Sequence, residues 1–260
     1  MSTHVFYKYQ GAGNDFVVLD NRDGSFDGRN VDLVRRLCDR RFGIGGDGLM
    51  LLQTAEGFDF EMVYYNADGQ EGSMCGNGGR CIVAFARDLG IIDSITDFLA
   101  VDGPHRAQIT GDWVSLKMID VSEVTQDGQA YVLNTGSPHY VREVEALESF
   151  AVVDEGQRIR YSDAYRESGI NVNFVQPEGS GFFVRTYERG VEDETLACGT
   201  GATAVALAMA WRDGKDGAQE TPIRVAGGQL NIRFNKQGSL FSDVYLEGPA
   251  VFVFEGKIAF

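Results

Sequence analysis

Apolar residues fill nearly every position of two short segments, Cys81–Ala86 and Ala202–Trp211. A helix that is hydrophobic on all sides is one that lies inside a protein core. Both segments are too short to cross a bilayer, which takes about 20 apolar residues. We therefore predict two buried helices. The residues expected at their ends are Asn77 and Thr200 as N-caps, and Gly90 and Gly214 just past the C-termini.

Aromatic and β-branched residues, in part alternating with polar ones, predict strands around these helices. The expected strands are Phe58–Tyr65, Trp113–Met118, Gly181–Tyr187, Ile223–Val225, Gln229–Phe234, Asp243–Leu246 and Val251–Phe254. Asn66–Gly69 reads Asn-Ala-Asp-Gly, which is typical of a turn. Val31–Arg41 has the pattern of an amphipathic helix.

Both buried segments follow the same short motif, Cys-Gly-X-Gly, at Cys75 and at Cys198. The two cysteines are 123 residues apart in a chain of 260, which indicates an internal repeat of about half the chain. The expected fold is α+β, with two pseudo-symmetric halves, each a curved mixed β-sheet or barrel around a buried central helix. We expect the halves to be residues 1–120, carrying Cys75, and 121–260, carrying Cys198. The boundary falls in the polar stretch Asp120–Gly128, and the last strand may pack back on the N-terminal half.

Composition narrows the possible binding partners and the expected cellular location. The net charge of −15 disfavours binding to nucleic acid or to an anionic membrane, so an anionic substrate would need a locally positive site. Met1–Gln10 has no apolar signal region, and no run of 18 apolar residues occurs, so we expect a cytoplasmic protein with reduced thiols. The spacing of the four cysteines matches no zinc pattern and only three histidines are present, so no metal is expected.

The position of Cys75 and Cys198 suggests acid/base chemistry. Cysteines before apolar helices are usually small buried hydrophobes, which is our interpretation of Cys38 and Cys81. The start of a helix, however, carries partial positive charge and N–H donors, which lower the pKa of a thiol and bind carboxylates. Two such thiols, one from each half, would suit inversion at carbon. One thiolate removes a proton from one face, and the opposite thiol returns a proton to the other.

At these residues the sequence resembles the diaminopimelate epimerase family. The matching motifs cover nearly the whole chain and occur in the family's order. They are Lys8–Phe16, Arg41–Gly48, Tyr65–Cys81, Gly136–His139, Ile170–Phe174, Tyr187–Gly190, Ala197–Gly201 and Glu247–Ala250.

The resemblance implies interconversion of LL- and meso-diaminopimelate without pyridoxal phosphate or a metal. It implies that Cys75 and Cys198 are the two catalytic residues, and that the partner is a small amino acid, with a homodimer possible. Groups around the reacting carboxylate would come from Gly76, Asn77, Gly199 and Thr200. Further substrate contacts would come from Asn14, Asn66, Ser137, His139, Asn171, Glu188 and Arg189. Arg189 suits the distal carboxylate and Glu188 the distal ammonium.

One position departs from the pattern, and other functions stay open. Ser137 stands where many family members have Asn, so a hydroxyl replaces an amide that contacts the distal end of the substrate. Proline racemases and hydroxyproline epimerases also use paired cysteines, but typically have His at the position of Asn77, and phenazine-type isomerases of this fold lack the pair. A thiol redox switch would not need Glu188 and Arg189, and two intact motifs argue against an inactive binding protein.

Overall fold

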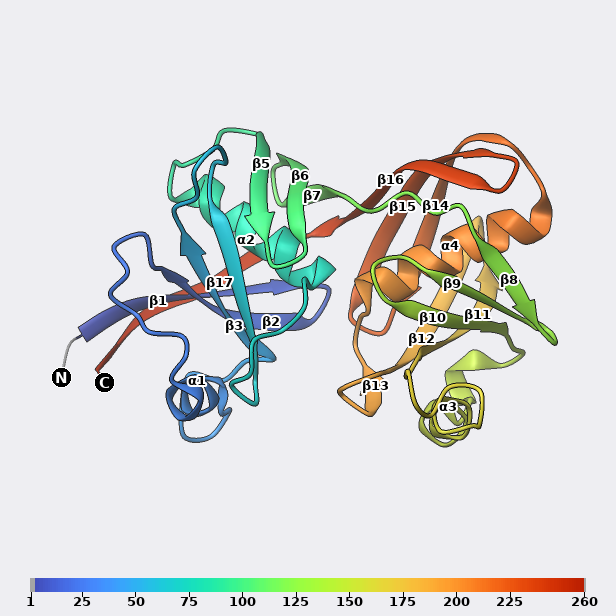
Figure 1. Ribbon diagram of the computed structural model, residues 1–260, viewed down its shortest axis with the longest axis horizontal. Coiled ribbons are helices and arrows are strands. Elements are labelled where there is room, and N and C mark those ends of the chain that lie inside the picture. The colour runs from blue at the N-terminus through green and yellow to red at the C-terminus, as the bar shows by residue number, and fades with distance from the viewer. Residues whose placement is uncertain (1–2, 260) are drawn as a thin grey trace. The chain divides into compact units, whose positions relative to one another are not determined.

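The computed structural model describes residues 3–259 and divides the chain into two compact units. The first unit holds the chain up to Leu116 together with the segment from Gly248 onward, and the second is Lys117–Glu247. Each unit contains one long helix packed among strands (Figure 1). Among the described helices, none combines the length and the apolar character that crossing a membrane requires.

The first unit is a mixed sheet with two helices. Its elements are β1 (Thr3–Gly11), β2 (Asn14–Asp20), α1 (Val31–Cys38), β3 (Gly48–Gln53), β4 (Glu61–Asn66), α2 (Gly76–Asp88), β5 (Ile95–Ala100), β6 (Gly103–Thr110), β7 (Trp113–Lys117) and β17 (Val251–Ala259). Strand β1 pairs antiparallel with both β2 and β17. The pairs β2–β3 and β4–β5 are parallel, whereas β3–β4, β5–β6 and β6–β7 are antiparallel.

The second unit repeats this plan. Its elements are β8 (Val124–Asp127), β9 (Ala130–Asn134), β10 (Pro138–Glu143), η1 (Leu147–Ser149), α3 (Val152–Arg160), β11 (Asn171–Glu178), β12 (Gly181–Glu188), β13 (Asp193–Thr195), α4 (Gly199–Asp213), β14 (Gly217–Val225), β15 (Gly228–Gln237) and β16 (Leu240–Pro249). The pairs β10–β11 and β12–β14 are parallel. The pairs β8–β9, β9–β10, β11–β12, β14–β15 and β15–β16 are antiparallel.

The two units therefore share one topology. In each, a hairpin leads through a helix to a second hairpin, then to the buried helix and finally to three strands. The parallel pairs fall at the same two steps, β2–β3 with β4–β5 and β10–β11 with β12–β14. Strand β17 pairs with β1 as β8 pairs with β9, so the last strand of the chain takes part in the first unit. The expected fold of two pseudo-symmetric α+β halves is confirmed.

Helices α2 and α4 are buried as the apolar pattern predicted. Every residue from Gly76 to Ala86 in α2 is buried, and α4 is buried from Gly201 to Ala210. Helix α2 packs against β1, β2, β3, β4, β6 and β17, and α4 against β9, β10, β11, β12, β14 and β15. A fully buried side chain such as Ile82 or Leu207 contributes about 1.5–3 kcal/mol relative to an exposed one. Each helix therefore forms the centre of its unit's core.

The helix starts differ from the prediction by two residues. The N-caps are Cys75 and Cys198, and neither Asn77 nor Thr200 is a cap. Both cysteines have extended backbone angles, with φ of −106° and −114°, and helical conformation begins at the glycine that follows. At the other end, Gly214 closes α4 with φ +67° and Gly90 lies just past α2 with φ +69°, as expected.

The other elements shift mainly at their ends. The expected helix Val31–Arg41 ends at Cys38, because the Asp39 carboxylate accepts hydrogen bonds from the N–H groups of Arg41 and Phe42 and turns the chain. The expected strand Phe58–Tyr65 begins only at Glu61. The turn Asn66–Gly69 is present, closed by a hydrogen bond from the Gly69 N–H to the Asn66 carbonyl.

Candidate active site

The two expected catalytic thiols lie at equivalent backbone positions, each as the N-cap of its unit's core helix. Neither side chain accepts a capping hydrogen bond, so the first N–H groups of α2 and α4 are not satisfied by their caps. Such a helix start attracts negative charge. This backbone setting is the same for Cys75 and Cys198, so it cannot distinguish them.

Cys38 and Cys81 differ sharply from this pair. None of the four cysteines is in a disulfide. Burial raises the pKa of both Cys38 and Cys81 to about 12, so these two stay protonated. They belong to the cores of the first unit, as predicted from the sequence.

In the first unit, Cys75 lies beside two of the expected substrate contacts. The Oδ1 atom of Asn14 is 3.8 Å from the Cys75 sulfur and accepts a 3.3 Å hydrogen bond from Nδ2 of Asn77. The structure thus brings Asn14, Cys75 and Asn77 together. Asn66 ends β4 with an exposed side chain. Within residues 3–259, no hydrogen bond joins that side chain to another expected site residue.

Two residues that the sequence analysis did not assign complete this cluster. Asp47 accepts a 2.5 Å hydrogen bond from Nδ2 of Asn14, and Arg80 donates a 3.0 Å hydrogen bond to Oδ1 of Asn77. Arg80 is fully buried, and its other donors reach the carbonyls of Gly76 and Pro249. It forms no ion pair with a carboxylate in the described part of the chain. Burial lowers the pKa of Arg80, against the favourable interaction with the two nearby thiols.

In the second unit, four expected residues form a chain of hydrogen bonds that reaches Cys198. Ser137 Oγ lies 3.0 Å from Nε2 of His139, 3.1 Å from Nδ2 of Asn171 and 3.2 Å from Oγ1 of Thr200. Oγ1 of Thr200 lies 3.5 Å from the Cys198 sulfur. Burial, with the nearby charge of Arg189, lowers the pKa of His139 to about 3, so this imidazole is neutral.

Glu188 and Arg189 end β12 and begin the following loop. Oε2 of Glu188 accepts a 2.9 Å hydrogen bond from the Thr195 hydroxyl. The Arg189 guanidinium donates to the Ser168 carbonyl, and the Arg189 N–H donates to Oδ1 of Asn171. Among the described residues, Arg189 has no carboxylate partner. Its charge is therefore available to an anion, unlike that of an arginine in an ordinary surface ion pair.

Asn173 is the residue of this unit that sequence reasoning missed. Its buried amide donates to Nδ1 of His139 and to the Tyr140 carbonyl, and it accepts from the Thr186 hydroxyl. The sequence did carry a pattern that points to it. Alternate residues of a strand share a face, so the Asn-Val-Asn of β11 places Asn173 on the same face as Asn171.

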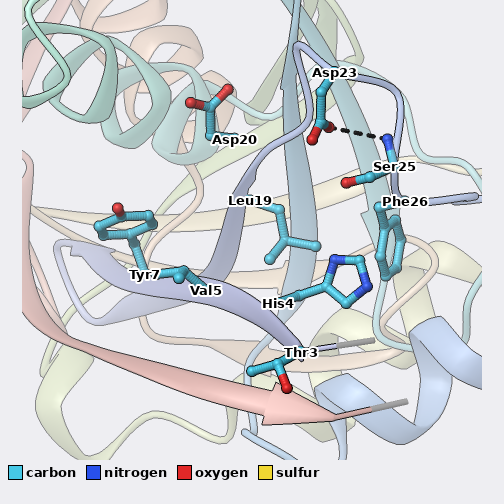
Figure 2. Close-up of a pocket in the computed structure, with 9 residues that line it drawn as sticks. All are labelled: Thr3, His4, Val5, Tyr7, Leu19, Asp20, Asp23, Ser25 and Phe26. Atoms are coloured by element: carbon cyan, nitrogen blue, oxygen red, sulfur yellow. Dashed lines mark hydrogen bonds between the residues drawn. The ribbon is translucent and has the colours of Figure 1, made fainter. Parts of the chain in front are cut away.

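A cavity of about 280 Å³ opens elsewhere in the first unit, and Figure 2 shows its lining. The residues around it are Thr3, His4, Val5, Tyr7, Leu19, Asp20, Asp23, Ser25 and Phe26. None of the expected site residues lines this cavity. Among residues 3–259, no three His, Cys, Asp or Glu side chains gather in a way that could hold a metal ion.

The fold places the chain in a known class of two-unit α+β proteins. It superimposes on a phenazine biosynthesis protein of the PhzF family from Bacillus anthracis with a TM-score of 0.79 at 13% identity, each chain covered completely. It superimposes on a hydroxyproline epimerase from Agrobacterium vitis with a TM-score of 0.72 at 14% identity, over 98% of this chain and 92% of that one. At such low identity these matches define the fold alone.

Sequence similarity then defines the family. The model of the diaminopimelate epimerase family matches residues 6–111 and 131–253. A diaminopimelate epimerase of Flavobacterium psychrophilum is 54% identical over 97% of this chain and 99% of its own length. That of Chlorobaculum tepidum is 44% identical over 95% and 98%, respectively. The chain therefore belongs to the diaminopimelate epimerase family, as the motifs indicated.

Proposed function

We propose that this protein is an amino-acid isomerase that interconverts LL- and meso-diaminopimelate. The observation that carries the proposal is the pair of thiols at the starts of two buried helices, in a chain 54% identical to a protein named for this activity. The proposal also includes a cytoplasmic location, where thiols stay reduced.

In the proposed reaction both thiols act on one α-carbon. One sulfur, as the thiolate, takes the α-proton, and the other, as the thiol, gives its proton to the opposite face. The electron pair left by the departing proton moves toward the α-carboxylate. Backbone N–H groups at the starts of α2 and α4 stabilise that charge, which suits a reaction without pyridoxal phosphate or a metal.

Substrate selection is assigned to the two charged residues at the end of β12 and just after it. Arg189 binds the distal carboxylate and Glu188 the distal ammonium, a complementary pair for a second amino-acid centre. The absence of a carboxylate partner for Arg189, within the residues that the structure describes, supports this assignment. Proline and hydroxyproline have no second amino-acid centre, so they offer no carboxylate and ammonium for this arginine and this glutamate to bind.

The direct test compares substrates with the purified protein. Circular dichroism or chiral chromatography should show inversion of LL-diaminopimelate and none of proline or hydroxyproline. Inversion of proline at a comparable rate would move the protein to another activity of the same fold. If no substrate is inverted, and redox buffer oxidises and reduces the thiol pair, a redox switch would be favoured instead.

Isotope labelling tests the two-thiol mechanism separately. The thiol that gives its proton exchanges with solvent before substrate binds. In heavy water, product from the first turnovers should therefore carry deuterium at the inverted carbon while the remaining substrate stays unlabelled. Retention of the original hydrogen in the product would contradict the use of two separate thiols.

A further inference from the structure

The hydrogen bonds around Cys198 have a direction that the structure fixes. The Tyr140 carbonyl can only accept, so the atom of Asn173 that faces it, 3.0 Å away, is the amide nitrogen. The same nitrogen lies 3.1 Å from Nδ1 of His139, which must then be an acceptor. Because His139 is neutral, its proton is on Nε2, and Nε2 donates to Ser137 Oγ.

From Ser137, hydrogen-bond donation continues in the same direction to the Cys198 sulfur. The Arg189 N–H donates to Oδ1 of Asn171, so the amide nitrogen of Asn171 faces Ser137 and donates to it. With two donors on its oxygen, the Ser137 hydroxyl directs its own proton to Thr200 Oγ1, 3.2 Å away. The Thr200 hydroxyl then directs its proton to the Cys198 sulfur, 3.5 Å away. A donor aimed at sulfur favours the thiolate.

Around Cys75 the direction is reversed. The carboxylate of Asp47 can only accept, so Nδ2 of Asn14 faces it and Oδ1 of Asn14 faces the Cys75 sulfur. At the other end, Arg80 can only donate, so Oδ1 of Asn77 faces Arg80, and Nδ2 of Asn77 donates to Oδ1 of Asn14. The atom presented to Cys75 is therefore an acceptor. An acceptor next to sulfur favours the protonated thiol.

We propose that the substrate-free protein holds Cys198 as the thiolate and Cys75 as the thiol, set by opposite hydrogen-bond directions at the two sulfurs. Thr200 contacts the reacting sulfur, while Ser137, His139 and Asn173 are positioning residues that act through it. The inference rests on the proposed function for its catalytic meaning. It assigns the base in the first turnover to Cys198, and the diaminopimelate isomer whose α-proton faces Cys198 can react without a prior proton transfer.

Charged groups near the two sulfurs do not all favour this assignment. Near Cys75, Arg80 lies on α2 itself and favours a thiolate, whereas Asp47, before β3, opposes one through Asn14. In the second unit, Glu188 ends β12 and Arg189 follows it, and His139 on β10 is uncharged. The proposal holds that the atoms in contact with each sulfur outweigh Arg80, whose three hydrogen bonds all go to oxygen atoms of Asn77, Gly76 and Pro249.

Alkylation by iodoacetamide without substrate tests the assignment. Only thiolates react, so the rate at each cysteine, resolved by peptide mass spectrometry from pH 5 to 10, gives a midpoint for each sulfur. The expected midpoint is lower for Cys198 than for Cys75 by at least about one pH unit, a factor of about ten in thiolate population. Accessibility cannot produce this result, because a midpoint does not depend on access and Cys198 is the more buried of the two.

Two valine variants of α4 show whether the hydroxyl chain is the cause. Thr200→Val keeps the side-chain shape and removes the donor, and should raise the Cys198 midpoint so that alkylation at pH 7 slows about tenfold. Thr203→Val is the matched control, since that buried hydroxyl donates to the Gly199 carbonyl, and the Cys198 midpoint should stay as in the wild type. Ser137→Ala should shift the midpoint in the same direction as Thr200→Val, but less.

Equal midpoints, or a lower midpoint at Cys75, would overturn the proposal and make Arg80 the dominant influence. An unchanged midpoint in Thr200→Val would overturn the role of the hydroxyl chain. Since iodoacetamide needs no substrate, a protein that shows this thiol asymmetry yet fails to epimerise diaminopimelate would contradict the proposed function and leave this inference standing.

Discussion

Cys75 and Cys198 occupy the same backbone position in two units of the same topology, but their neighbours differ. Cys75 is partly exposed and faces an amide oxygen, while Cys198 is buried and faces a hydroxyl. Five residues further along each helix, the first unit has buried Arg80 and the second has buried Thr203. A repeat can therefore preserve a helix start while the surrounding side chains give each copy a different chemical environment.

The largest expected effect comes from removing either sulfur. Cys75→Ala and Cys198→Ala should each lower epimerisation by at least about a thousandfold, because no other group replaces the lost acid or base on its face. The measurement is the rate of inversion of diaminopimelate. Cys38→Ala is the control and should keep most activity, since that thiol is buried and protonated. Near wild-type turnover by Cys198→Ala would show that the two copies do not act as a pair.

The next largest effect concerns Arg189, which follows β12 in the second unit. Arg189→Lys should lose about 2–4 kcal/mol of transition-state binding, because lysine cannot make the two-pronged contact with a carboxylate. The expected readout is a fall of about 30-fold to 1,000-fold in kcat/KM. Arg212→Lys is a matched control, since that arginine pairs with Glu143 and Asp213 on the surface. Equal kinetics for both variants would remove Arg189 from the substrate site.

The two Cys-Gly-X-Gly motifs should also differ in their tolerance of a methyl group. A Cβ at Gly201 would lie 2.3 Å from Oδ1 of Asn173. The Asn173 side chain is held in place by two hydrogen bonds at Nδ2 and one at Oδ1. Gly201→Ala should therefore destabilise the fold by about 2 kcal/mol. A Cβ at Gly78 would meet the flexible ends of Met50 and Met62, at 3.1 and 3.3 Å, so Gly78→Ala should cost about 1 kcal/mol or less. Denaturant unfolding measures both, and equal losses would show that the copies are packed alike.

The smallest effect is a pH dependence that belongs to the second unit. The pKa of His139 is about 3 in the folded protein, below its ordinary value of 6.5, so between these values only the unfolded chain binds the proton. The contribution of neutral His139 to the free energy of unfolding is therefore complete above pH 6.5. It declines by about 1.4 kcal/mol per pH unit as the pH falls toward 3. His139→Gln should thus lose less stability than the wild type between pH 6.5 and 5 in urea unfolding. Parallel curves would place a protonated His139 in the folded state.

Much of the fold followed from the sequence because the two core helices are apolar on all sides and the motif before them is repeated. From the sequence, the last strand could pack back on the N-terminal half, and β17 pairs there with β1. Which strands become parallel did not follow from the sequence, since nothing local specifies it. The helix starts were misplaced by two residues because Asn and Thr are common capping residues, whereas here the extended cysteines cap the helices without a side-chain hydrogen bond.

The site residues also divide into those that the sequence predicted and those that it did not. The cysteines and the amide residues near them lie in motifs, so the sequence could predict them as site residues. The structure places Asn14 with Cys75 and Ser137 with Thr200. Arg80 and Asn173 lie inside the matched motifs Tyr65–Cys81 and Ile170–Phe174, but neither residue was predicted from the sequence to have a role. Their importance lies in the direction of hydrogen bonds, which depends on groups that can only donate or only accept, such as the Arg80 guanidinium and the Tyr140 carbonyl.

The pairing of β17 with β1 governs the order in which the protein can be completed during synthesis. Thr3 pairs with Ala259, so β1 waits for its partner until β17 has been made. The second unit is a continuous segment, Lys117–Glu247, and has all its own strands before β17 is made. The first unit is built earlier but closes later, and until then β1 presents an open strand edge. Truncation near residue 248 would thus leave the first unit without β17 and the second unit with all its own strands.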